Sequence, residues 1–344
     1  MDELGTLGEL PPDYVDALRA ENLVPLWPSL RSLLPPERPR TATLPTHWRW
    51  SAIRPLLLRA GSLTPIEKAE RRVLVLANPG RGLDNLQASS AIYLGMQLVL
   101  PGETAPNHRH TPNAARVVVE GSGACTIVGG EKCPMRHGDL VLTPSGLWHE
   151  HRHEGEGPFI WLDVLDLPLM VYLDVSYVIQ GEAQKVRRDP AAYGAGGILP
   201  RVHGRATTAR YPLLRYDWER TREALVALAS TTDRDAPVEV AYVNPESGAD
   251  ALNTLAFSAL MLRPGETQAL KRLSAARVFH VVEGTGQARI GDTELRFEAA
   301  DTFCAPGLAP IALANASARA PLFVVVADES PVHRKLGVLE TREA

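Results

Sequence analysis

The 344-residue chain has few cysteines, no long apolar run and no strong excess of one charge. Its three cysteines stand at no metal-ligand spacing, which argues against a disulfide framework and against a thiolate zinc site. The longest apolar runs, such as residues 321–327, are far too short to span a bilayer. A formal net charge of −4 without a basic block argues against nucleic acid as the main partner. Residues 1–15 lack the pattern of a signal peptide, so we predict a cytoplasmic protein.

Histidines, by contrast, are concentrated in residues 102–153, which hold six of the ten in the chain. Five of these six form two short clusters beside β-branched residues, His108-Arg109-His110 and His149-Glu150-His151-Arg152-His153. Because side chains at i and i+2 of a strand point to the same face, the histidines of each cluster project together. Two such strands packed opposite one another would bring imidazoles to one point, as in the metal site of a β-barrel.

An internal repeat is the second informative feature. Four motifs recur in the same order, with an offset that drifts only from 166 to 162 residues. They are NPxxGxDxL at 78 and 244, PGET at 101 and 264, VVEG at 118 and 281, and Asp-x4-Pro at 139 and 301. Four matches in register indicate a duplication, and the chain is long enough for two domains with a core each.

The two copies differ where the chemistry would be. In the alignment set by the motifs, His108, His110 and His149 correspond to Lys271, Leu273 and Ile311. The glycines and prolines of the turns are shared by both copies, whereas the histidines are not, so the fold does not need them. We therefore expect a metal in the first copy alone.

This pattern predicts four segments along the chain. Residues 1–70 form a helical and proline-rich arm, and residues 71–180 form a metal-binding barrel. Residues 181–235 form a linker and a helix, and residues 236–344 form a metal-free barrel. The helix is expected from Asp217, which can cap it ahead of an acidic first turn.

The spacing of the histidines matches a known signature. Gly102-x5-His108-x-His110, followed by Gly138-x5-Pro144-x-Gly146-x2-His149, is similar to the two-part motif of the cupin barrels. The first cupin motif usually supplies a glutamate ligand soon after its second histidine, but here no carboxylate occurs before Glu120. Glu120 belongs to the Glu-Gly pair shared with the ligand-free copy, so we expect it to be structural.

A three-histidine site with Arg116 close by resembles the gentisate, salicylate and 1-hydroxy-2-naphthoate 1,2-dioxygenase group of bicupins. The resemblance covers nearly the whole chain and is carried by residues 65–80, 101–121, 138–151 and 161–169. It implies an all-β-dominated bicupin fold, with two double-stranded β-helix (jelly-roll-like) barrels and an N-terminal helical arm. It also implies one Fe(II) per chain, O2 as co-substrate, a small aromatic acid as substrate, and a homotetramer.

The reaction implied by the resemblance inserts O2 between the carboxyl-bearing and hydroxyl-bearing carbons of a hydroxylated aromatic acid. Gentisate, which would give maleylpyruvate, is the first expectation. Salicylate, a substituted salicylate or 1-hydroxy-2-naphthoate is the alternative. Val117 and Val164 depart from the family pattern and are expected to reshape the substrate pocket.

Three neutral imidazoles suit iron, zinc, copper or nickel, so the ligand type alone does not choose the metal. The spacing and the resemblance make His108, His110 and His149 the metal ligands. His151 shares a face with His149 and could act as a proton shuttle or hydrogen-bond the substrate, or be structural. Asp163 could accept the second N–H of a metal-bound imidazole, or be an ordinary strand residue.

A substrate carboxylate that enters a largely apolar barrel needs a cation, and guanidinium matches it best. Arg116 and Arg72 are the candidates, although Arg116 could simply pair with a barrel carboxylate. Arg71 and Arg72 are neighbours on one strand, so only one can face inward, and the resemblance places Arg72 at the pocket. Gln97 and Tyr93 share strand parity and could line the cavity or be ordinary packing residues.

Two other classes of function stay open, and two histidines are assigned no role in the site. The site could belong to a metal-dependent isomerase or hydrolase that uses zinc or manganese, or to a non-catalytic binding or storage cupin. A storage barrel would not need an arginine and an aspartate beside intact ligands in one copy. Dependence on ferrous iron and oxygen distinguishes the isomerase. His137 and His153 are expected at the surface or in turns.

Overall fold

The computed structural model describes residues 5–187, 201–202, 205–206, 211, 213–234 and 236–344. It divides the chain into two units, residues 1–42 and residues 43–344. The first unit contains 3-10 helices η1 (Leu7–Glu9) and η2 (Trp27–Ser29) and helices α1 (Pro12–Ala20) and α2 (Leu30–Leu33). None of its described residues is buried, so this unit has no core of its own. No helix in the described part of the chain is long and apolar enough to cross a membrane.

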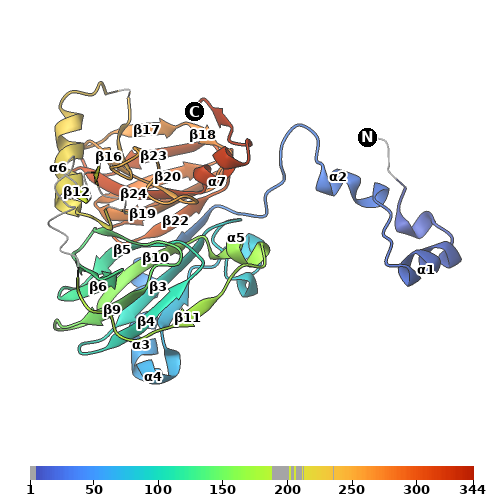
Figure 1. Ribbon diagram of the computed structural model, residues 1–344. Helices are drawn as coiled ribbons and strands as arrows, with labels where there is room; N and C mark the ends of the chain where they lie inside the picture. The colour runs from blue at the N-terminus through green and yellow to red at the C-terminus, as the bar shows by residue number, and fades with distance from the viewer. Residues whose placement is uncertain (1–4, 188–200, 203–204, 207–210, 212, 235) are drawn as a thin grey trace. The chain divides into compact units, whose positions relative to one another are not determined.

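The second unit consists of two β-barrels, each built from a six-stranded sheet and a smaller sheet (Figure 1). Barrel 1 has the strand orders β14-β8-β5-β10-β3-β2 and β11-β4-β9-β6-β7. Its strands are β2 (Arg72–Val75), β3 (Tyr93–Val99), β4 (Thr104–His110), β5 (Ala114–Glu120), β6 (Ala124–Val128), β7 (Glu131–Met135), β8 (Leu140–Thr143), β9 (His149–His153), β10 (Phe159–Leu165), β11 (Val178–Gln180) and β14 (Arg215–Tyr216).

Barrel 2 has the orders β1-β22-β19-β24-β16-β15 and β17-β23-β20-β21, with β18 and β25 as a separate pair. Its strands are β1 (Thr46–Trp48), β15 (Val238–Tyr242), β16 (Ala256–Leu262), β17 (Thr267–Leu270), β18 (Arg272–Leu273), β19 (Arg277–Glu283), β20 (Thr285–Ile290), β21 (Thr293–Glu298), β22 (Thr302–Ala305), β23 (Ile311–Asn315), β24 (Leu322–Asp328) and β25 (Thr341–Arg342). A short pair, β12 (Arg201–Val202) and β13 (Arg205–Ala206), lies between the barrels in sequence.

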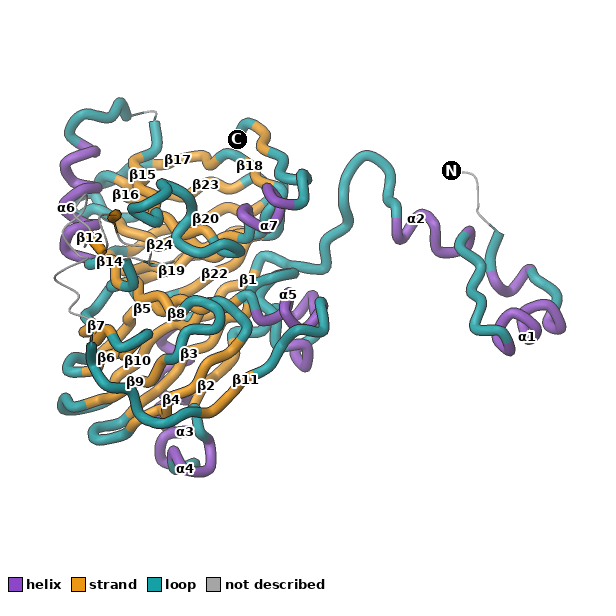
Figure 2. Tube along the Cα trace, in the orientation of Figure 1, coloured by secondary structure: helices purple, strands orange, loops and turns teal. Residues whose placement is uncertain are grey.

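Short helices border these sheets, and strands form the larger part of the unit (Figure 2). They are α3 (Trp50–Leu63), α4 (Ile66–Ala69), η3 (Pro79–Arg81), η4 (Leu83–Asn85), α5 (Leu167–Tyr172), α6 (Trp218–Ala229) and α7 (Ser330–Lys335). The helix expected from Asp217 is confirmed as α6, and the Asp217 carboxylate accepts a hydrogen bond from the Arg220 N–H at 3.2 Å.

The duplication read from the motifs appears as a shared strand register. Thr104 on β4 pairs with Arg152 on β9, and Thr267 on β17 pairs with Ala314 on β23, at the same positions of the repeat. The bicupin fold is therefore confirmed. Glu120 is structural as expected, because its carboxylate accepts two hydrogen bonds from Arg54 at 2.6 and 2.7 Å.

The barrels exchange their first strands. β1 precedes barrel 1 in sequence but pairs with β22 of barrel 2, and β14 precedes barrel 2 but pairs with β8 of barrel 1. Each exchanged strand leads into a helix, α3 or α6, that packs on the outer strands of the following barrel. Residues 43–70, which the sequence analysis grouped with the arm, thus lie in the unit that holds the barrels.

One aspartate of each barrel holds the exchanged segment. Asp301 Oδ1 accepts from the Trp50 N–H at 2.7 Å, and its Oδ2 lies 2.8 Å from His47 Nε2. Asp139 Oδ1 accepts from the Trp218 N–H at 2.9 Å, and its Oδ2 accepts from Arg215 Nε at 2.7 Å. Asp139 and Asp301 begin the Asp-x4-Pro motif, so this repeat marks the point where the two barrels are joined.

Replacing Asp301 with asparagine should lower the free energy of unfolding by about 2–3 kcal/mol at pH 7, since a buried charged acceptor is lost. Burial opposes ionisation of Asp301, but hydrogen bonds from His47 and from backbone N–H groups outweigh it and lower its pKa. A carboxyl whose pKa is lower when folded adds stability above its unfolded pKa of about 3.9, and that stability is lost as the pH falls.

Urea unfolding between pH 3 and pH 7 measures this effect. In the variant, the free energy of unfolding should fall less between pH 7 and pH 3 than it does in the wild type. The exposed Asp292→Asn should behave like the wild type. An Asp301→Asn curve that lies on the wild-type curve would contradict the role given to Asp301.

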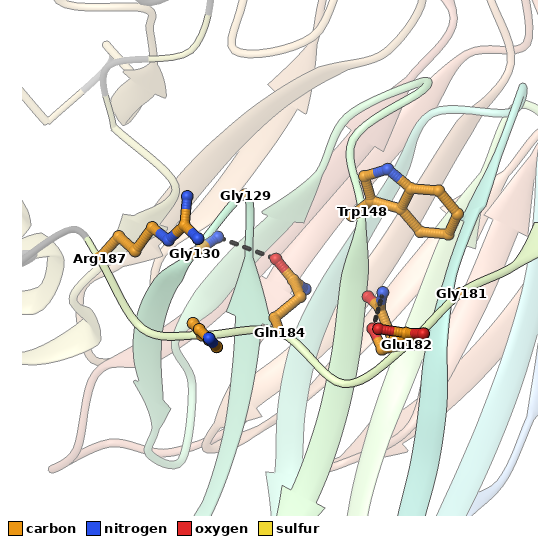
Figure 3. Close-up of a pocket in the computed structure, with 9 residues that line it drawn as sticks. Gly129, Gly130, Trp148, Gly181, Glu182, Gln184 and Arg187 are labelled. Atoms are coloured by element: carbon orange, nitrogen blue, oxygen red, sulfur yellow. Dashed lines mark hydrogen bonds between the residues drawn. The ribbon is translucent and has the colours of Figure 1, made fainter.

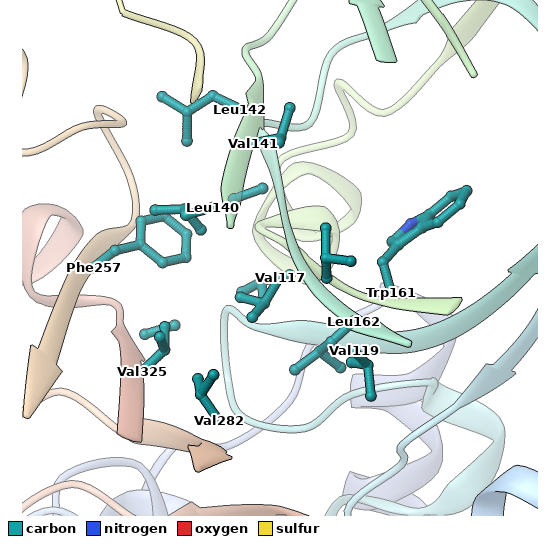
Figure 4. Packing of buried hydrophobic residues seen from close by; sticks show 14 of the residues in the cluster. Val117, Val119, Leu140, Val141, Leu142, Trp161, Leu162, Phe257, Val282 and Val325 are labelled. Carbon is teal, nitrogen blue, oxygen red and sulfur yellow. The ribbon is translucent and has the colours of Figure 1, made fainter. Parts of the chain in front are cut away.

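The six-stranded sheets of the two barrels face one another across an apolar layer (Figure 4). Barrel 1 contributes residues such as Val117, Leu140 and Leu162, and barrel 2 contributes Phe257, Val282 and Val325. Burial of each such side chain is worth about 1.5–3 kcal/mol. Val117 and Val164 both belong to this buried cluster, on the strand face opposite to Arg116 and Asp163, so the expectation that they reshape the pocket is wrong.

Candidate metal centre and substrate pocket

The three predicted ligand histidines come together inside barrel 1. β4 and β9 are antiparallel neighbours, and His108 pairs directly with His149 in their register. The ring centroids of His108 and His110 lie 4.2 and 4.7 Å from that of His149. One nitrogen from each ring lies within 4.8 Å of the others, and all three residues are buried. Within the described residues, this is the one group of three or more such side chains.

Hydrogen bonds orient each imidazole toward the shared centre. The Nδ1 atoms of His108, His110 and His149 lie 2.8, 2.8 and 2.9 Å from the backbone carbonyl oxygens of Pro106, Pro112 and Leu147. A carbonyl accepts only from N–H, so each Nδ1 carries the proton and each Nε2 keeps its lone pair. Burial lowers the pKa of His108 to about 3 and that of His110 to about 4. The rings are therefore neutral at pH 7, as metal ligands must be.

Buried polar atoms without partners show that this interior is built for a bound group. Gln97 Nε2 and His149 Nε2 have no hydrogen-bond partner among the described residues, whereas Arg116 Nε and Asp163 Oδ1 face each other as an ion pair and Trp161 interacts with Asp163. Leaving a buried donor or acceptor unsatisfied costs about 1–3 kcal/mol. A metal bound to His149 Nε2 and a polar ligand bound to Gln97 Nε2 would remove this cost. The donor set therefore fits a metal and an oxygen-rich small molecule.

Arg116 and Asp163 form a buried pair beside the histidines. Arg116 Nε lies 3.1 Å from Asp163 Oδ1, a close ion pair that is too poorly aligned for a hydrogen bond. Arg116 Nη1 donates to the Thr143 hydroxyl at 2.6 Å. Asp163 is not hydrogen-bonded to any of the three ligand histidines, whose Nδ1 atoms face backbone carbonyls. The role expected for Asp163, orienting a metal-bound imidazole, is therefore wrong.

Arg72 does not face the cavity, because strand alternation places it on the outer side of β2. Its Nη1 donates to the carbonyl of Gly61 on α3 at 3.2 Å, and its guanidinium pairs with Glu103. Arg71, the residue before β2, is exposed, and its charge acts on the site. Its charge lowers the pKa of His108 and His110 and opposes the rise in the pKa of Asp163. The prediction of Arg72 as a pocket residue is therefore wrong, and Arg71 is the cation of this pair whose charge acts on the histidines.

Gln97 and Tyr93 lie on β3 opposite Trp161 and Leu165 of β10, with Gly95 between them opposite Asp163. Gln97 is buried, and its Nε2 has no partner among the described residues. Burial raises the pKa of Tyr93, and the Asp163 carboxylate shifts it in the same direction. Both residues share the face of Asp163, as their parity predicted.

Gly95 leaves room that any larger residue would fill. A Cβ atom there would lie 2.5 Å from Val73 Cγ1 and 2.8 Å from the Tyr93 hydroxyl oxygen. Gly95→Ala should displace the Tyr93 ring and lower kcat/KM for an aromatic acid by about 10- to 100-fold, since a misplacement of about 1 Å has that effect. Steady-state kinetics and metal content measure the change, and Gly8→Ala, whose Cβ would meet only Thr6 Oγ1 at 3.9 Å, is the control for a glycine-to-alanine change. Unchanged kinetics would show that this wall does not touch the substrate.

His151 is buried at the edge of the same interior. Its Nδ1 lies 2.8 Å from the Thr126 hydroxyl, and its ring centroid is 5.8 Å from that of His149. His153, expected at the surface or in a turn, is instead buried with its Nε2 2.8 Å from the carbonyl oxygen of Gly157. His153 shares the inward face of β9 with His149 and His151, and it is buried at the far end of the strand.

A hollow of about 410 Å³ lies beside the strands that carry the histidines (Figure 3). Asn107 and Trp148, the neighbours of His108 and His149, line it together with residues of the segment 181–187. Gln184 binds both Gly130 N–H and the carbonyl of Ile127, each at 2.9 Å. This part of the predicted linker thus braces β6 and the turn that follows it.

Comparison with known proteins agrees with this geometry. Residues 95–165 match the Cupin domain family. A gentisate 1,2-dioxygenase from Ralstonia sp. is 58% identical, over 99% of this chain and 96% of that protein. Gentisate 1,2 dioxygenase 1 from Aquipseudomonas alcaligenes is 38% identical, over 87% of each. The crystal structure of a salicylate 1,2-dioxygenase adduct with gentisate, from Pseudoaminobacter salicylatoxidans, superposes with a TM-score of 0.89 at 30% identity, over 99% of this chain and 98% of that one.

These relatives span nearly the whole chain, and the structure supplies the two barrels and the histidine centre that the family resemblance implied. The chain therefore belongs to the gentisate 1,2-dioxygenase group of the bicupin ring-cleaving dioxygenases.

Proposed function

We propose that this chain is an Fe(II)-dependent dioxygenase that cleaves the ring of gentisate to maleylpyruvate. The observation that carries the proposal is the neutral three-histidine centre beside a buried arginine whose Nε has no hydrogen-bond partner among the described residues. The 58% identity to a gentisate 1,2-dioxygenase supports the choice of substrate.

His108, His110 and His149 would hold the iron through their Nε2 atoms, one ion per chain. An Fe(II) ion held by three side chains would supply open coordination positions and the electron density that activates O2. The protein itself supplies orientation and charge. The three carbonyl oxygens behind the rings fix the direction of each lone pair before the metal arrives.

Arg116 and Arg71 would bind the carboxylate of the aromatic acid. Arg116 is held in place by Thr143 and Asp163, and its Nε points to no other acceptor. Arg71, just before β2, adds a second positive charge that acts on Asp163. Gln97 and Tyr93 would contact the ring and its hydroxyl groups, with Gly95 providing the space between them.

His151 would hydrogen-bond the substrate or move a proton. Burial lowers its pKa well below the usual value, so the ring is neutral. Its Nδ1 is engaged by the Thr126 hydroxyl, which leaves Nε2 as the atom available to the interior. A neutral imidazole with one free nitrogen can exchange a proton with a phenolic hydroxyl group.

Salicylate or a substituted salicylate is the second candidate, because the superposed relative is a salicylate 1,2-dioxygenase. Oxygen uptake by anaerobically Fe(II)-loaded protein, with gentisate and then salicylate, tests both. We expect one O2 consumed per gentisate and a new near-ultraviolet absorbance from the ring-opened product. Oxygen uptake with salicylate alone would identify salicylate, and not gentisate, as the substrate. No uptake with either acid would favour a metal-dependent isomerase.

The N-terminal unit would serve assembly into a homotetramer in the cytoplasm. Its large apolar side chains are exposed and need a partner surface: Leu23, Val24, Leu26, Leu33 and Leu34 are each more than half exposed. The three buried free cysteines suit a reducing compartment. Sedimentation equilibrium should give four chains per particle, and a monomeric particle would exclude this assembly.

A further inference from the structure

Barrel 2 keeps a cavity although it has none of the ligand histidines. The cavity has a volume of about 440 Å³, within the range of about 300–1,000 Å³ that small-molecule sites occupy. Lys271 and Leu273, which stand at the repeat positions of His108 and His110, are among its lining residues. The cavity therefore occupies the part of barrel 2 that corresponds to the metal centre of barrel 1.

The wall of this cavity is mixed: its floor is apolar, and its polar lining residues include the cations Lys271 and Arg277 and the carboxylates Glu239, Asp328 and Glu343. Phe279 and Val326 line it at the repeat positions of Arg116 and Asp163. Behind Phe279 the barrel is filled by stacked rings, with Phe303 centred 4.8 Å from Phe279 and 5.1 Å from Phe297. The charged pair of barrel 1 is thus replaced by an apolar floor, on which an aromatic or aliphatic body could rest.

One buried cation opens into the cavity. Arg277, at the start of β19, is only 8% exposed and lines the cavity. Among the described residues, no acceptor lies within hydrogen-bonding or ion-pair distance of its guanidinium. The guanidinium lies over the Phe279 ring, whose centroid is 5.9 Å from the guanidinium carbon. A buried guanidinium without an acceptor is costly, and a carboxylate would satisfy it through two parallel hydrogen bonds.

The acidic neighbours of Arg277 do not fill this role. Asp328 pairs with Arg277 in the strand register, but its carboxylate accepts from the Ser330 N–H at 2.7 Å. Burial raises the pKa of Asp328, which weakens it further as a counter-ion. Glu239 acts on Arg277 only at a distance. The guanidinium N–H groups of Arg277 are therefore available to a ligand inside the cavity.

The last described residues cover the cavity. Thr341, Glu343 and Ala344 line it, and β25 is held to β18 by the pairing of Arg272 with Arg342 and of Leu273 with Thr341. Lys271 Nζ and Glu343 Oε1, both well exposed, lie 3.9 Å apart. A two-residue strand and one exposed ion pair hold this cover weakly, so it can open for a small molecule.

We propose that barrel 2 binds a second small organic acid, with Arg277 as the partner of its carboxylate and Phe279 as the floor under its apolar body. The site is separate from the histidine centre and needs no metal. The occupant is an aromatic carboxylate, either the substrate of the proposed reaction or an unrelated acid of the same chemistry.

Binding of 4-fluorobenzoate to the Fe(II)-loaded protein, followed anaerobically by fluorine NMR and equilibrium dialysis, tests the proposal. The wild type should bind two molecules per chain, one in each barrel. Arg277→Gln should weaken the second site by about 10- to 100-fold, the usual effect of losing a hydrogen bond to a charged group. Oxygen consumption with gentisate should be unchanged, because Arg277 lies outside barrel 1.

A second variant distinguishes loss of the site from a folding defect. Ser258→Leu fills the cavity from β16 while leaving Arg277 itself in place, and it should also lose the second molecule. The exposed Arg289→Gln, on the same barrel, should keep both molecules. Retention of the second molecule by Arg277→Gln or by Ser258→Leu, or a single molecule per chain in the wild type, would overturn the proposal.

Gentisate added to the saturated protein separates the two sources of ligand. Displacement of both molecules identifies the enzyme's own substrate as an occupant, and displacement of one identifies a different aromatic acid. Either result supports the site. Failure of the proposed ring cleavage would appear instead as absent oxygen uptake in the wild type, whatever the number of bound molecules.

Discussion

His149→Ala should abolish ring cleavage and reduce the affinity for the metal by more than about 100-fold. Even groups that only support a metal ligand contribute about 10- to 100-fold, so a ligand itself should contribute more. His149 is fully buried, its ring packs against those of both His108 and His110, and its Nε2 has no other partner among the described residues. Metal content per chain and oxygen uptake measure the two effects.

His137→Ala is the matched control. His137 is exposed, its Nδ1 meets the carbonyl oxygen of Val119 at 3.0 Å, and it lies outside the histidine centre. The variant should keep its metal and its activity. If His149→Ala retained the iron of the wild type after dialysis, the three histidines would not be the metal ligands, and the polar atoms of this interior would need another explanation.

Arg116→Leu should destabilise the protein by about 3–5 kcal/mol and remove nearly all activity. The substitution leaves Asp163 buried without its cation, and breaking a buried ion pair on one side has a cost of that size. It also removes the guanidinium proposed to bind the substrate carboxylate. Chemical unfolding measures the first effect, and the dependence of oxygen uptake on gentisate concentration measures the second.

The double variant Arg116→Leu/Asp163→Leu separates the two roles of Arg116. Two apolar side chains leave no unpaired charge, so stability should return close to that of the wild type. Activity should not return, because no cation faces the substrate carboxylate from β5. Recovery of both properties would show that Arg116 only balances Asp163, which is the alternative that the sequence left open.

Duplication explains how one chain carries both a metal centre and an unrelated cavity. The turns, the strand register and the aspartates that join the barrels are common to both copies. The side chains that point into each barrel do not determine these shared features, so they can differ between the two copies. Barrel 1 therefore holds histidines around Arg116, whereas barrel 2 holds a phenylalanine stack and places Arg277 two residues earlier on the equivalent strand.

The sequence alone determined the features that depend on local periodicity. Alternation along a strand placed His108 with His110 and His149 with His151 on common faces. The shared turn motifs identified the two copies, and their differences confined the metal centre to the first. The cap at Asp217 and the structural role of Glu120 also followed from neighbouring residues or from the repeat. These features need no knowledge of what packs against them.

Only the tertiary structure decided which face of a strand looks inward and which segments meet. Alternation required that Arg71 and Arg72 point to opposite sides, but the choice depended on α3, which covers the outer face and receives Arg72 through Gly61. The partner of Asp163 lies on another strand, more than forty positions away in sequence. The exchanged strands β1 and β14 likewise pair with strands that are distant in sequence. Such contacts join segments distant along the chain, and their energies depend on packing that no local pattern records.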